Sequence, residues 1–404
     1  MLALVAAAEL LGMASWFAAA AVSPYLRERW HLGVAESGWL TAIVQLGFVA
    51  GTAVAALFNL ADLIPARAYF SVSAALAALA NGALVISPGY GVALASRFLT
   101  GFFLAGVYPP AMKMIATWFR ARRGLAIGVV VGALVVGKAT PYLVHAFQSL
   151  HMETVVLSAS IAALAASALV AVGYRDGPFP FARRPFSWDL ATIAWRNRET
   201  RLAIAGYLGP MWELYAMWAW MPTFLVASAA ARAAAGHGGM DSRLADLMSF
   251  GTLASGGFGC VWAGWVAHRI GYARVVQIAM VASGICSLLI GLCFGASPWL
   301  LAPLALVWGF FVVADSAQFS AMVSEAAPPH AVGTALTLQT SLGFLLTMVT
   351  IQLIPVIVAA VGWRWAFPLL ALGPVAGIAA IARLPKGRGR AVGAEPVARA
   401  AGSG

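Results

Sequence analysis

Residues 206–225 read GYLGPMWELYAMWAWMPTFL. This run is as long as a helix needs to be to cross the hydrocarbon core of a bilayer. It is mostly apolar and aromatic, with one carboxylate, Glu213, near its middle. A charge at the centre of a membrane helix costs about 2.5–3.5 kcal/mol on insertion scales, so such a residue usually faces a protein interior or a wet cavity. We therefore expect a membrane protein whose function involves buried charges.

The composition of the whole chain agrees with a membrane location. Of its 404 residues 62% are hydrophobic and only 10% are charged, and the mean hydropathy is +0.87. Soluble domains carry about 25% charged residues. The formal net charge of +11 is expected from basic loops that set the topology, and not from binding to nucleic acid. Three cysteines, Cys260, Cys286 and Cys293, lie in apolar runs without the spacing of a disulfide or metal framework, which indicates packing residues.

Twelve apolar stretches of sufficient length follow from segmenting the chain at charges, proline and glycine. The first is read as a span and not as a signal peptide, because it has no basic residue at its start; we expect a few cytoplasmic residues before it. The predicted spans are 2–24, 35–57, 68–86, 90–112, 122–144, 152–173, 202–227, 246–267, 273–294, 297–323, 332–357 and 364–383. Most of the 25 lysines and arginines fall on the inner side if both termini are cytoplasmic. The prediction is a multi-pass protein of a bacterial cytoplasmic (inner) membrane.

The chain also repeats itself at about half its length. GFFLAGVYPPAMKMIATWFRARRGLA starts at Gly101, and GFFVVADSAQFSAMVSEAAPPHAVGTA starts at Gly309. FNLADLIPARAY from Phe58 and GWVAHRIGYAR from Gly264 form a second pair at nearly the same spacing. Such halves are common in secondary transporters. We predict an all-α membrane protein with two pseudo-symmetric six-helix bundles at 1–173 and 201–383, a cytoplasmic linker at 174–200 and a disordered tail at 384–404.

These motifs resemble the major facilitator superfamily over essentially the whole chain. The family's loop after the second span follows a G-x-L-a-D-r-x-G-r-r pattern, and FNLADLIPAR keeps the leucine, alanine, aspartate and last arginine of that pattern. Phe58 and Pro65 stand in place of its glycines. The resemblance implies the twelve-helix major facilitator fold. It also implies gating roles for Asp62 and Arg67 and, in the second copy, for Arg269.

The fourth span, RFLTGFFLAGVYP, is similar to the family's R-x-x-x-G pattern. The fifth span, GVVVGALVVGKATP, lacks the Gly-Pro-x-x-Gly-Gly block of the family's drug/proton antiporters, which lowers the weight of an efflux function. MWELYAMWAW and ADSAQFSAMV resemble a bacterial branch often labelled nitrate/nitrite-porter-like, although the long glycine-rich nitrate signature is not visible.

Six ionisable residues fall inside the predicted spans: Glu9, Arg97, Lys113, Lys138, Glu213 and Asp315. Unpaired, they would oppose folding by about 15–20 kcal/mol, which exceeds the net stability of about 5–15 kcal/mol of a typical protein. Most must therefore be paired, protonated or wet. Lys113 lies near a predicted cytoplasmic end, where a long side chain can reach water.

Helical spacing indicates where these charges face. Glu213 shares a side of its helix with Gly209, Met217 and Trp220, and polar residues line one side of the tenth and eleventh spans, which suggests a shared aqueous chamber. A buried carboxylate can load and release a proton as access alternates, whereas a buried cation can grip an anion. We assign substrate contact to Arg97, Lys138, Trp220, Gln318 and Gln339, and proton coupling to Glu213, Asp315 and Glu9.

The resulting hypothesis is a secondary active transporter that takes up a small organic or inorganic anion with protons by alternating access. It acts as a monomer in the lipid bilayer, without a cofactor, a metal or nucleic acid. Three alternatives stay open: efflux of drugs or metabolites, import of copper through Met217 and Met221, and a non-transporting membrane sensor or assembly factor. An enzyme is not expected, because the glycine-rich GTLASGGFG lies in an apolar helix and no catalytic set converges.

Overall fold

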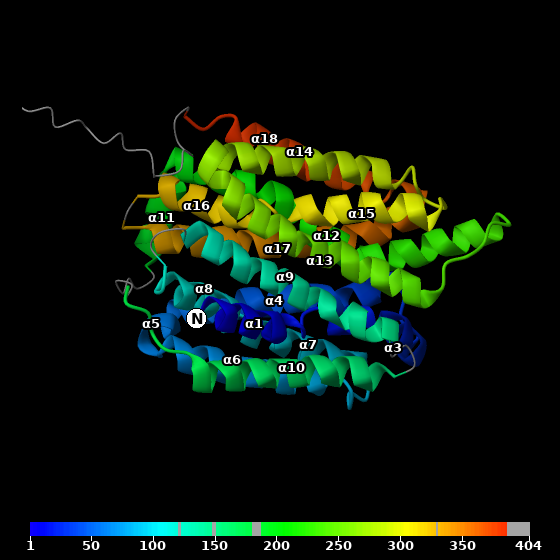
Figure 1. The fold of residues 1–404 in the computed structure, drawn as a ribbon, viewed down its shortest axis with the longest axis horizontal. Coiled ribbons are helices and arrows are strands. Elements are labelled where there is room, and N and C mark those ends of the chain that lie inside the picture. The colour runs from blue at the N-terminus through cyan, green and yellow to red at the C-terminus, as the bar shows by residue number, and fades with distance from the viewer. Residues whose placement is uncertain (120–122, 148–150, 180–186, 329, 386–404) are drawn as a thin grey trace, which may run out of the picture.

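The computed structural model describes residues 1–119, 123–147, 151–179, 187–328 and 330–385. Within these ranges the chain is helical and contains no strand. Its long helices run along one common axis and form two groups, which we call the N-terminal half (α1–α10) and the C-terminal half (α12–α18) (Figure 1).

The N-terminal half contains several interrupted helices. In chain order they are α1 (Leu2–Met13), α2 (Ala18–Ala21), α3 (Ser23–Trp30), α4 (Val34–Leu57), α5 (Leu60–Leu63), α6 (Ala66–Gly82), α7 (Tyr90–Leu104), α8 (Tyr108–Ala116), α9 (Arg123–Phe147) and α10 (Met152–Gly173). α11 (Trp188–Arg196) connects the halves. The C-terminal half contains α12 (Arg198–Ala234), α13 (Ser242–Ile270), α14 (Tyr272–Ile290), α15 (Pro298–Val312), α16 (Ser316–Ala326), α17 (Val332–Val361), two 3-10 turns (Trp363–Trp365 and Pro368–Ala371) and α18 (Leu372–Ile381).

Ten helical stretches of the described residues are long and apolar enough to cross a membrane. Three of them combine consecutive elements: α7 with α8, α15 with α16, and the two 3-10 turns with α18. The other two predicted spans, 2–24 and 68–86, coincide with the interrupted run α1–α3 and with the 17-residue α6. The predicted all-α membrane fold is therefore confirmed, and its twelve predicted spans each coincide with helix.

The main departure from the predicted boundaries is α12, which is much longer than the predicted span 202–227. It begins early because the side chain of Asn197 accepts a hydrogen bond from the Thr200 backbone N–H and so caps the helix. It continues to Ala234 through the alanine-rich run ASAAARAA, whose residues favour helix. Part of the region predicted as a polar linker is thus helical.

Two pairs of helices join the halves. α9 packs along α13, and α4 packs along α17. Glycines allow the first pair to touch backbone to backbone: a Cβ at Gly132 would lie 2.7 Å from the carbonyl oxygen of Gly257, and one at Gly128 would lie 3.0 Å from that of Cys260. Small residues at such contacts are what let membrane helices approach closely.

The two ends of the helix bundle differ. One end carries α5, α11, Met1 and the end of α18, and we call it the linker end; the opposite end, where α12 turns into α13, is the far end (Figure 1). Midway between them, α1 stops at Met13 and the chain becomes helical again at Ala18, and α15 stops at Val312 before α16 starts at Ser316. These breaks lie next to the central site.

Candidate functional site

Lys138 is the polar centre of the interface between the halves. It lies on α9 and is only 2% exposed. Its Nζ donates a hydrogen bond to the hydroxyl of Tyr215 on α12 over 2.6 Å. The same Nζ lies 3.7 Å from the ring centroid of Trp16 and 5.7 Å from that of Trp218. Aromatic rings within about 6 Å attract an ammonium through their negative faces. We call Trp16, Tyr215 and Trp218 the aromatic box.

The approach of α1 to α9 builds one side of this box. A Cβ at Gly137 would overlap the backbone carbonyl oxygen of Leu10, so glycine is needed where the two helices cross. Because α1 ends at Met13, Trp16 lies in the non-helical turn that follows, beside Lys138. The local sequence therefore places a lysine and a tryptophan from different helices against each other.

A cavity of about 60 Å³ adjoins Lys138 between the halves. Its lining comes from both halves: Met13, Trp16, Tyr108, Val131, Leu134, Val135, Lys138, Tyr207, Met211, Leu214, Tyr215, Trp218, Val313, Ser316, Ser320, Thr340 and Phe344. Ligand pockets are usually about 300–1,000 Å³. The cavity must therefore enlarge before it can hold a solute of several heavy atoms.

The cavity is rich in hydrogen-bond donors. The indole Nε1 atoms of Trp16 and Trp218 are buried and have no hydrogen-bond partner among the described atoms. An indole N–H can only donate, and an ammonium can only donate. The lining given above contains no acidic side chain. An anion would therefore find a cation and two unused donors close together.

Aromatic side chains close the cavity toward the far end. The rings of Trp16 and Phe344 have centroids 5.8 Å apart, and those of Phe48 and Phe344 are 4.6 Å apart, so each pair joins the two halves. Toward the linker end, Tyr108, Ser320 and Thr340 keep some exposed surface.

Glu9 is an acidic residue close to Lys138. Its side chain is fully buried on α1, and neither carboxylate oxygen has a hydrogen-bond partner in the described part of the chain. Glu9 and Lys138 lie close enough for their charges to interact. The two residues therefore form an internal pair of opposite charges across the contact between α1 and α9.

Glu213 does not line the central cavity, contrary to the expected cavity wall, and its role in proton coupling stays a prediction. Its Oε1 accepts a hydrogen bond of 2.6 Å from Trp308 Nε1 on α15, and its Oε2 accepts one of 2.9 Å from Ser283 Oγ on α14. The glycine one turn earlier, Gly209, packs against the backbone of Gly373 and Gly377 on α18. This side of α12 is therefore an internal helix contact of the C-terminal half.

Asp315 and Gln318 lie beside the cavity without lining it. Asp315 precedes α16 at the break after α15 and is 1% exposed, and its Oδ1 has no hydrogen-bond partner among the described residues. The next residue, Ser316, does line the cavity. Gln318 is also buried, with an unpartnered Oε1 within the described chain.

The other two C-terminal residues assigned to the substrate are also outside the cavity lining. Trp220 donates a 2.8 Å hydrogen bond to the carbonyl oxygen of Ile351 and lies against Gly38 of the N-terminal half, so it helps to close the far end. Gln339 is buried next to Thr340, which lines the cavity. The predicted contact of Trp220 with solute in the central cavity does not agree with this placement.

Arg97 is fully buried in the N-terminal half and does not line the cavity, so its predicted contact with substrate stays a prediction that this structure does not support. Its Nη1 donates to Asn81 Oδ1 over 2.6 Å. Its Nη2 donates to the backbone carbonyl oxygens of Ser15 and Trp16 over 3.0 and 2.6 Å. The guanidinium is thus bound to the break that follows α1.

The predicted gating residues are at the linker end. The side chain of Asp62 lies outside the described part of the structure. Arg67 is exposed at the start of α6, and Arg269 is exposed near the end of α13, with its guanidinium 4.2 Å from the ring centroid of Trp265. Their gating roles stay predictions.

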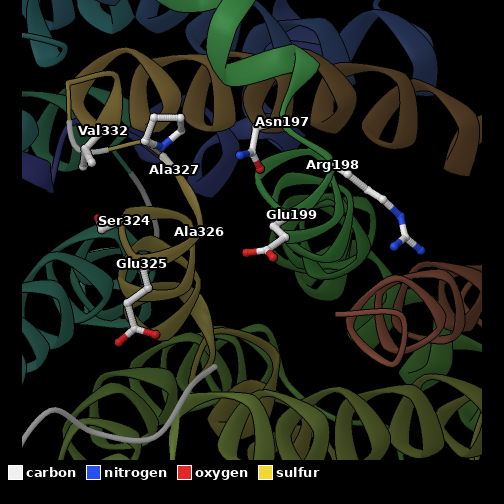
Figure 2. A pocket seen from close by; sticks show the side chains of 9 residues that line it. Asn197, Arg198, Glu199, Ser324, Glu325, Ala326, Ala327 and Val332 are labelled. Atoms are coloured by element: carbon white, nitrogen blue, oxygen red, sulfur yellow. The ribbon is translucent and has the colours of Figure 1, made fainter. Parts of the chain in front are cut away.

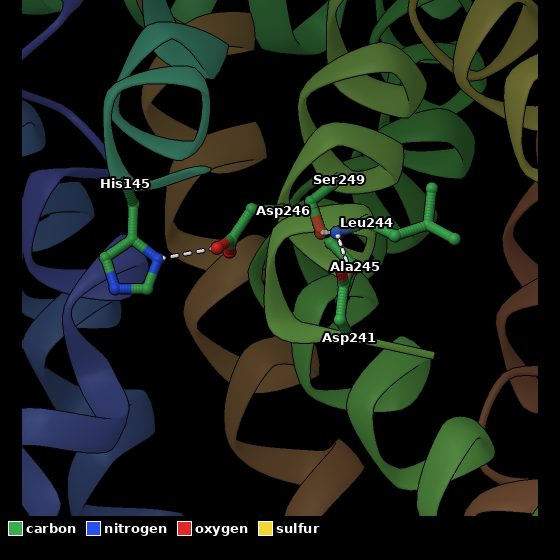
Figure 3. A network of polar contacts seen from close by, with 6 residues as sticks. All are labelled: His145, Asp241, Leu244, Ala245, Asp246 and Ser249. Carbon is green, nitrogen blue, oxygen red and sulfur yellow. Dashed lines mark hydrogen bonds and ion pairs between the residues drawn. The ribbon is translucent and has the colours of Figure 1, made fainter. Parts of the chain in front are cut away.

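The sequence interpretation missed two polar contacts between the halves. One is the bond from Lys138 to Tyr215. The other is at the far end, where His145 Nδ1 of α9 and Asp246 Oδ2 of α13 are 2.7 Å apart (Figure 3). His145 directly follows the predicted span 122–144, and Asp246 is the first residue of the span 246–267. An ionisable residue at the edge of an apolar span is the sequence signal for a contact of this kind.

A second, larger depression of about 680 Å³ lies at the linker end of the C-terminal half, between the start of α12 and the connection from α16 to α17 (Figure 2). It includes Arg198, Glu199 and Glu325. It is built from one half alone and has a charged lining, so it lacks the cross-half position of the central cavity. Among the described residues there is no group of three or more His, Cys, Asp or Glu that could hold a metal.

Comparison with known proteins gives the family. Residues 4–236 match the sequence model described as Major Facilitator Superfamily, and residues 214–387 match the one described as Sugar (and other) transporter. The chain is also 35% identical over 94 residues to the niacin transporter NiaP of Acinetobacter baylyi (strain ATCC 33305 / BD413 / ADP1). That match covers 23% of this chain and 20% of the relative, so it spans about a fifth of the relative's length.

Proposed function

The chain belongs to the major facilitator superfamily of membrane transporters, and from that premise we propose that it takes up a small carboxylate anion together with a proton. The observation that carries the proposal is the donor-rich cavity: the Lys138 ammonium next to two indole N–H groups without partners, in a lining that holds no acid. The linker end is proposed to face the cytoplasm, and one chain is proposed to suffice.

The chemistry of the cavity favours an anion with a flat apolar body. Lys138 has a hydroxyl as its hydrogen-bond acceptor, and hydrogen bonds to an ionised acceptor are about twice as strong as neutral ones. A carboxylate could accept from Nζ and from an indole N–H at once. Aromatic rings on either side offer stacking surfaces for a ring.

Niacin is a pyridine carboxylic acid and so combines both features. The relative whose name includes niacin supports this choice of solute class, as does the geometry. A neutral sugar, which the second family description suggests, would leave the charge of Lys138 without an ionised partner. We therefore take nicotinate as the first probe.

Charge balance in the cavity provides the coupling. In the empty protein, Glu9 and Lys138 together are neutral when both are ionised. Binding of a monoanion would leave one uncompensated negative charge in a region of low dielectric, which is costly. A proton on Glu9 restores neutrality. Anion and proton are thus expected to bind and cross together, with Asp315 beside the cavity as a second proton-binding candidate.

No observation in the structure favours the alternatives. Met217 and Met221 are fully buried within the C-terminal half, and neither lines the cavity, so a copper route through them has no opening in this conformation. Efflux uses the same alternating access in reverse, and the direction of transport is a matter for experiment.

The test is uptake into proteoliposomes that contain the purified full-length protein. Radioactive nicotinate, benzoate, nitrate and glucose are compared with an acidic exterior. We expect uptake of the carboxylates, loss of at least about tenfold in Lys138→Met, and little change in Arg364→Gln, an exposed arginine at the far end. The proposal would be overturned if the wild-type protein took up glucose and Lys138→Met took up the same solute at the wild-type rate. Orientation is tested in cells with a membrane-impermeant thiol reagent added outside to Glu199→Cys, which should stay unlabelled if the linker end faces the cytoplasm.

A further inference from the structure

The break after α1 leaves two backbone carbonyl groups without helical partners. α1 ends at Met13 and α2 starts at Ala18, and the described backbone hydrogen bonds across the break include Trp16 N to Met13 O and Ala21 N to Phe17 O. None of them uses the carbonyl oxygens of Ser15 or Trp16. Buried carbonyls need a partner, because an unpaired one costs about 1–3 kcal/mol.

Arg97 supplies that partner for both groups. Its Nη2 donates to the carbonyl oxygens of Ser15 and Trp16, while Nη1 donates to Asn81. Asn81 in turn donates to Val156 O and Ser160 Oγ, each over 3.0 Å. The guanidinium thus bonds on one side to Asn81 of α6, which is itself bonded to α10, and on the other side to the backbone of the break after α1.

The position of the Trp16 backbone matters because of its ring. The ring centroid lies 3.7 Å from Lys138 Nζ, Trp16 lines the cavity, and its indole N–H has no hydrogen-bond partner among the described atoms. A tryptophan in a non-helical turn has no intrahelical hydrogen bond to fix it. Arg97 is the group that bonds directly to its backbone from another helix.

We infer that Arg97 is a positioning residue: it pins the Trp16 turn so that the indole lies over Lys138 and presents its N–H to the cavity. Arg97 acts through Trp16 and does not touch the solute. The geometric part is independent of the solute; the part that concerns solute binding rests on the proposed function.

The first test needs no solute. Full-length protein is labelled with 5-fluorotryptophan, and the ¹⁹F resonance of Trp16 is assigned by its loss in Trp16→Phe. We expect this resonance to shift or broaden in Arg97→Gln and to move back toward the wild-type position in Arg97→Lys. It should stay in place in Arg364→Gln, the matched exposed arginine. An unchanged Trp16 resonance in Arg97→Gln would overturn the inference.

A second variant covers poor folding of Arg97→Gln. Asn81→Ala removes the amide that orients Nη1 but keeps the guanidinium, and the same resonance should shift by a smaller amount. Its constancy would also count against the inference.

The transport test separates an indirect from a direct role. With nicotinate as the probe, Arg97→Gln should raise KM about tenfold with kcat little changed, and the effect should be absent in a Trp16→Phe background. Equal losses in both backgrounds would assign Arg97 to the solute instead. If wild-type protein takes up no nicotinate, the proposed function fails while the ¹⁹F result still decides the role of Arg97.

Discussion

Lys138 Nζ of α9 and the Tyr215 hydroxyl of α12 are 2.6 Å apart, and their hydrogen bond joins the two halves at the cavity. The lysine that would bind an anion therefore already donates one of its three N–H bonds to a hydroxyl from the opposite half. If a carboxylate binds there, we expect it to compete with Tyr215 as the stronger acceptor for Lys138 and so to loosen one contact between the halves. Solute binding and the movement of the halves would then share one group.

Tyr215→Phe keeps the ring and removes this competitor. We expect the affinity for nicotinate to rise about threefold to tenfold, since no hydrogen bond to a charged group has to be broken before binding. The measurement is equilibrium binding of radioactive nicotinate to detergent-purified protein. Tyr142→Phe is the control, because the Tyr142 hydroxyl is buried without a partner among the described atoms. Weaker binding in Tyr215→Phe would mean that the hydroxyl contacts the solute.

Glu9→Gln should separate anion uptake from the proton. If the proposed coupling holds, one anion and one proton cross together when Glu9 is present. Uptake should then be electroneutral, increase as the external pH falls below the internal pH, and be independent of membrane voltage. With glutamine, the anion crosses alone. Uptake should then lose its dependence on the pH gradient and accelerate when the interior is positive. The control is Glu28→Gln, an exposed carboxylate on α3. The measurement is proteoliposome uptake with pH gradient and potassium-diffusion potential varied independently.

The spans could be predicted from the sequence because the hydropathy of a stretch is a local property. The span 152–173 was predicted at the bounds of α10. The orientation of a side chain about its helix is not local, since it depends on which helices pack there. The buried polar residues predict a shared aqueous chamber, and Lys138 lines the cavity between the halves, whereas Gly209 and Glu213, interpreted as a wall of that chamber, do not. Glycine lets a backbone approach closely, and here the approaching backbone is α18 and not solvent.

The predicted roles of Arg97 and Trp220 differ from the structure for the same reason. Substrate contact is one of two roles that the sequence leaves open for Arg97, the other being helix packing, and in the structure backbone carbonyls and an amide accept its hydrogen bonds. Those carbonyls become free only because α1 stops at Met13, and nothing in the alanine-rich sequence after it marks that stop. The long-range contacts of Tyr215 and Asp246 likewise require the tertiary arrangement.

His145 and Asp246 tie α9 to α13 at the far end, where their side chains are 21% and 13% exposed (Figure 3). Asp246→Asn should weaken this tie by about 1 kcal/mol and so increase the far-open population about fivefold. The measurement is the distance between spin labels at the exposed far-end positions 25 and 364. Asp241→Asn, on the same helix end, caps α13 through Leu244 N and should have no such effect. Adding His145→Gln to Asp246→Asn should cause no further change; an additive effect would show that the two side chains act separately.

Glu213 offers the sharpest choice between a coupling and a structural carboxylate. In the structure its two oxygens accept from Trp308 and Ser283 within the C-terminal half, and glutamine can still accept from the indole N–H. Glu213→Gln should therefore fold with a stability loss below about 1 kcal/mol and keep the pH dependence of uptake. Glu213→Leu leaves the Trp308 indole N–H unpaired, while Ser283 keeps its hydrogen bond to the Met280 carbonyl oxygen. It should cost about 1–3 kcal/mol, measured by denaturant unfolding in detergent. If Glu213→Gln folds normally but no longer responds to the pH gradient while Glu9→Gln still does, the proton site lies in the C-terminal half and the charge-balance mechanism at Lys138 is wrong.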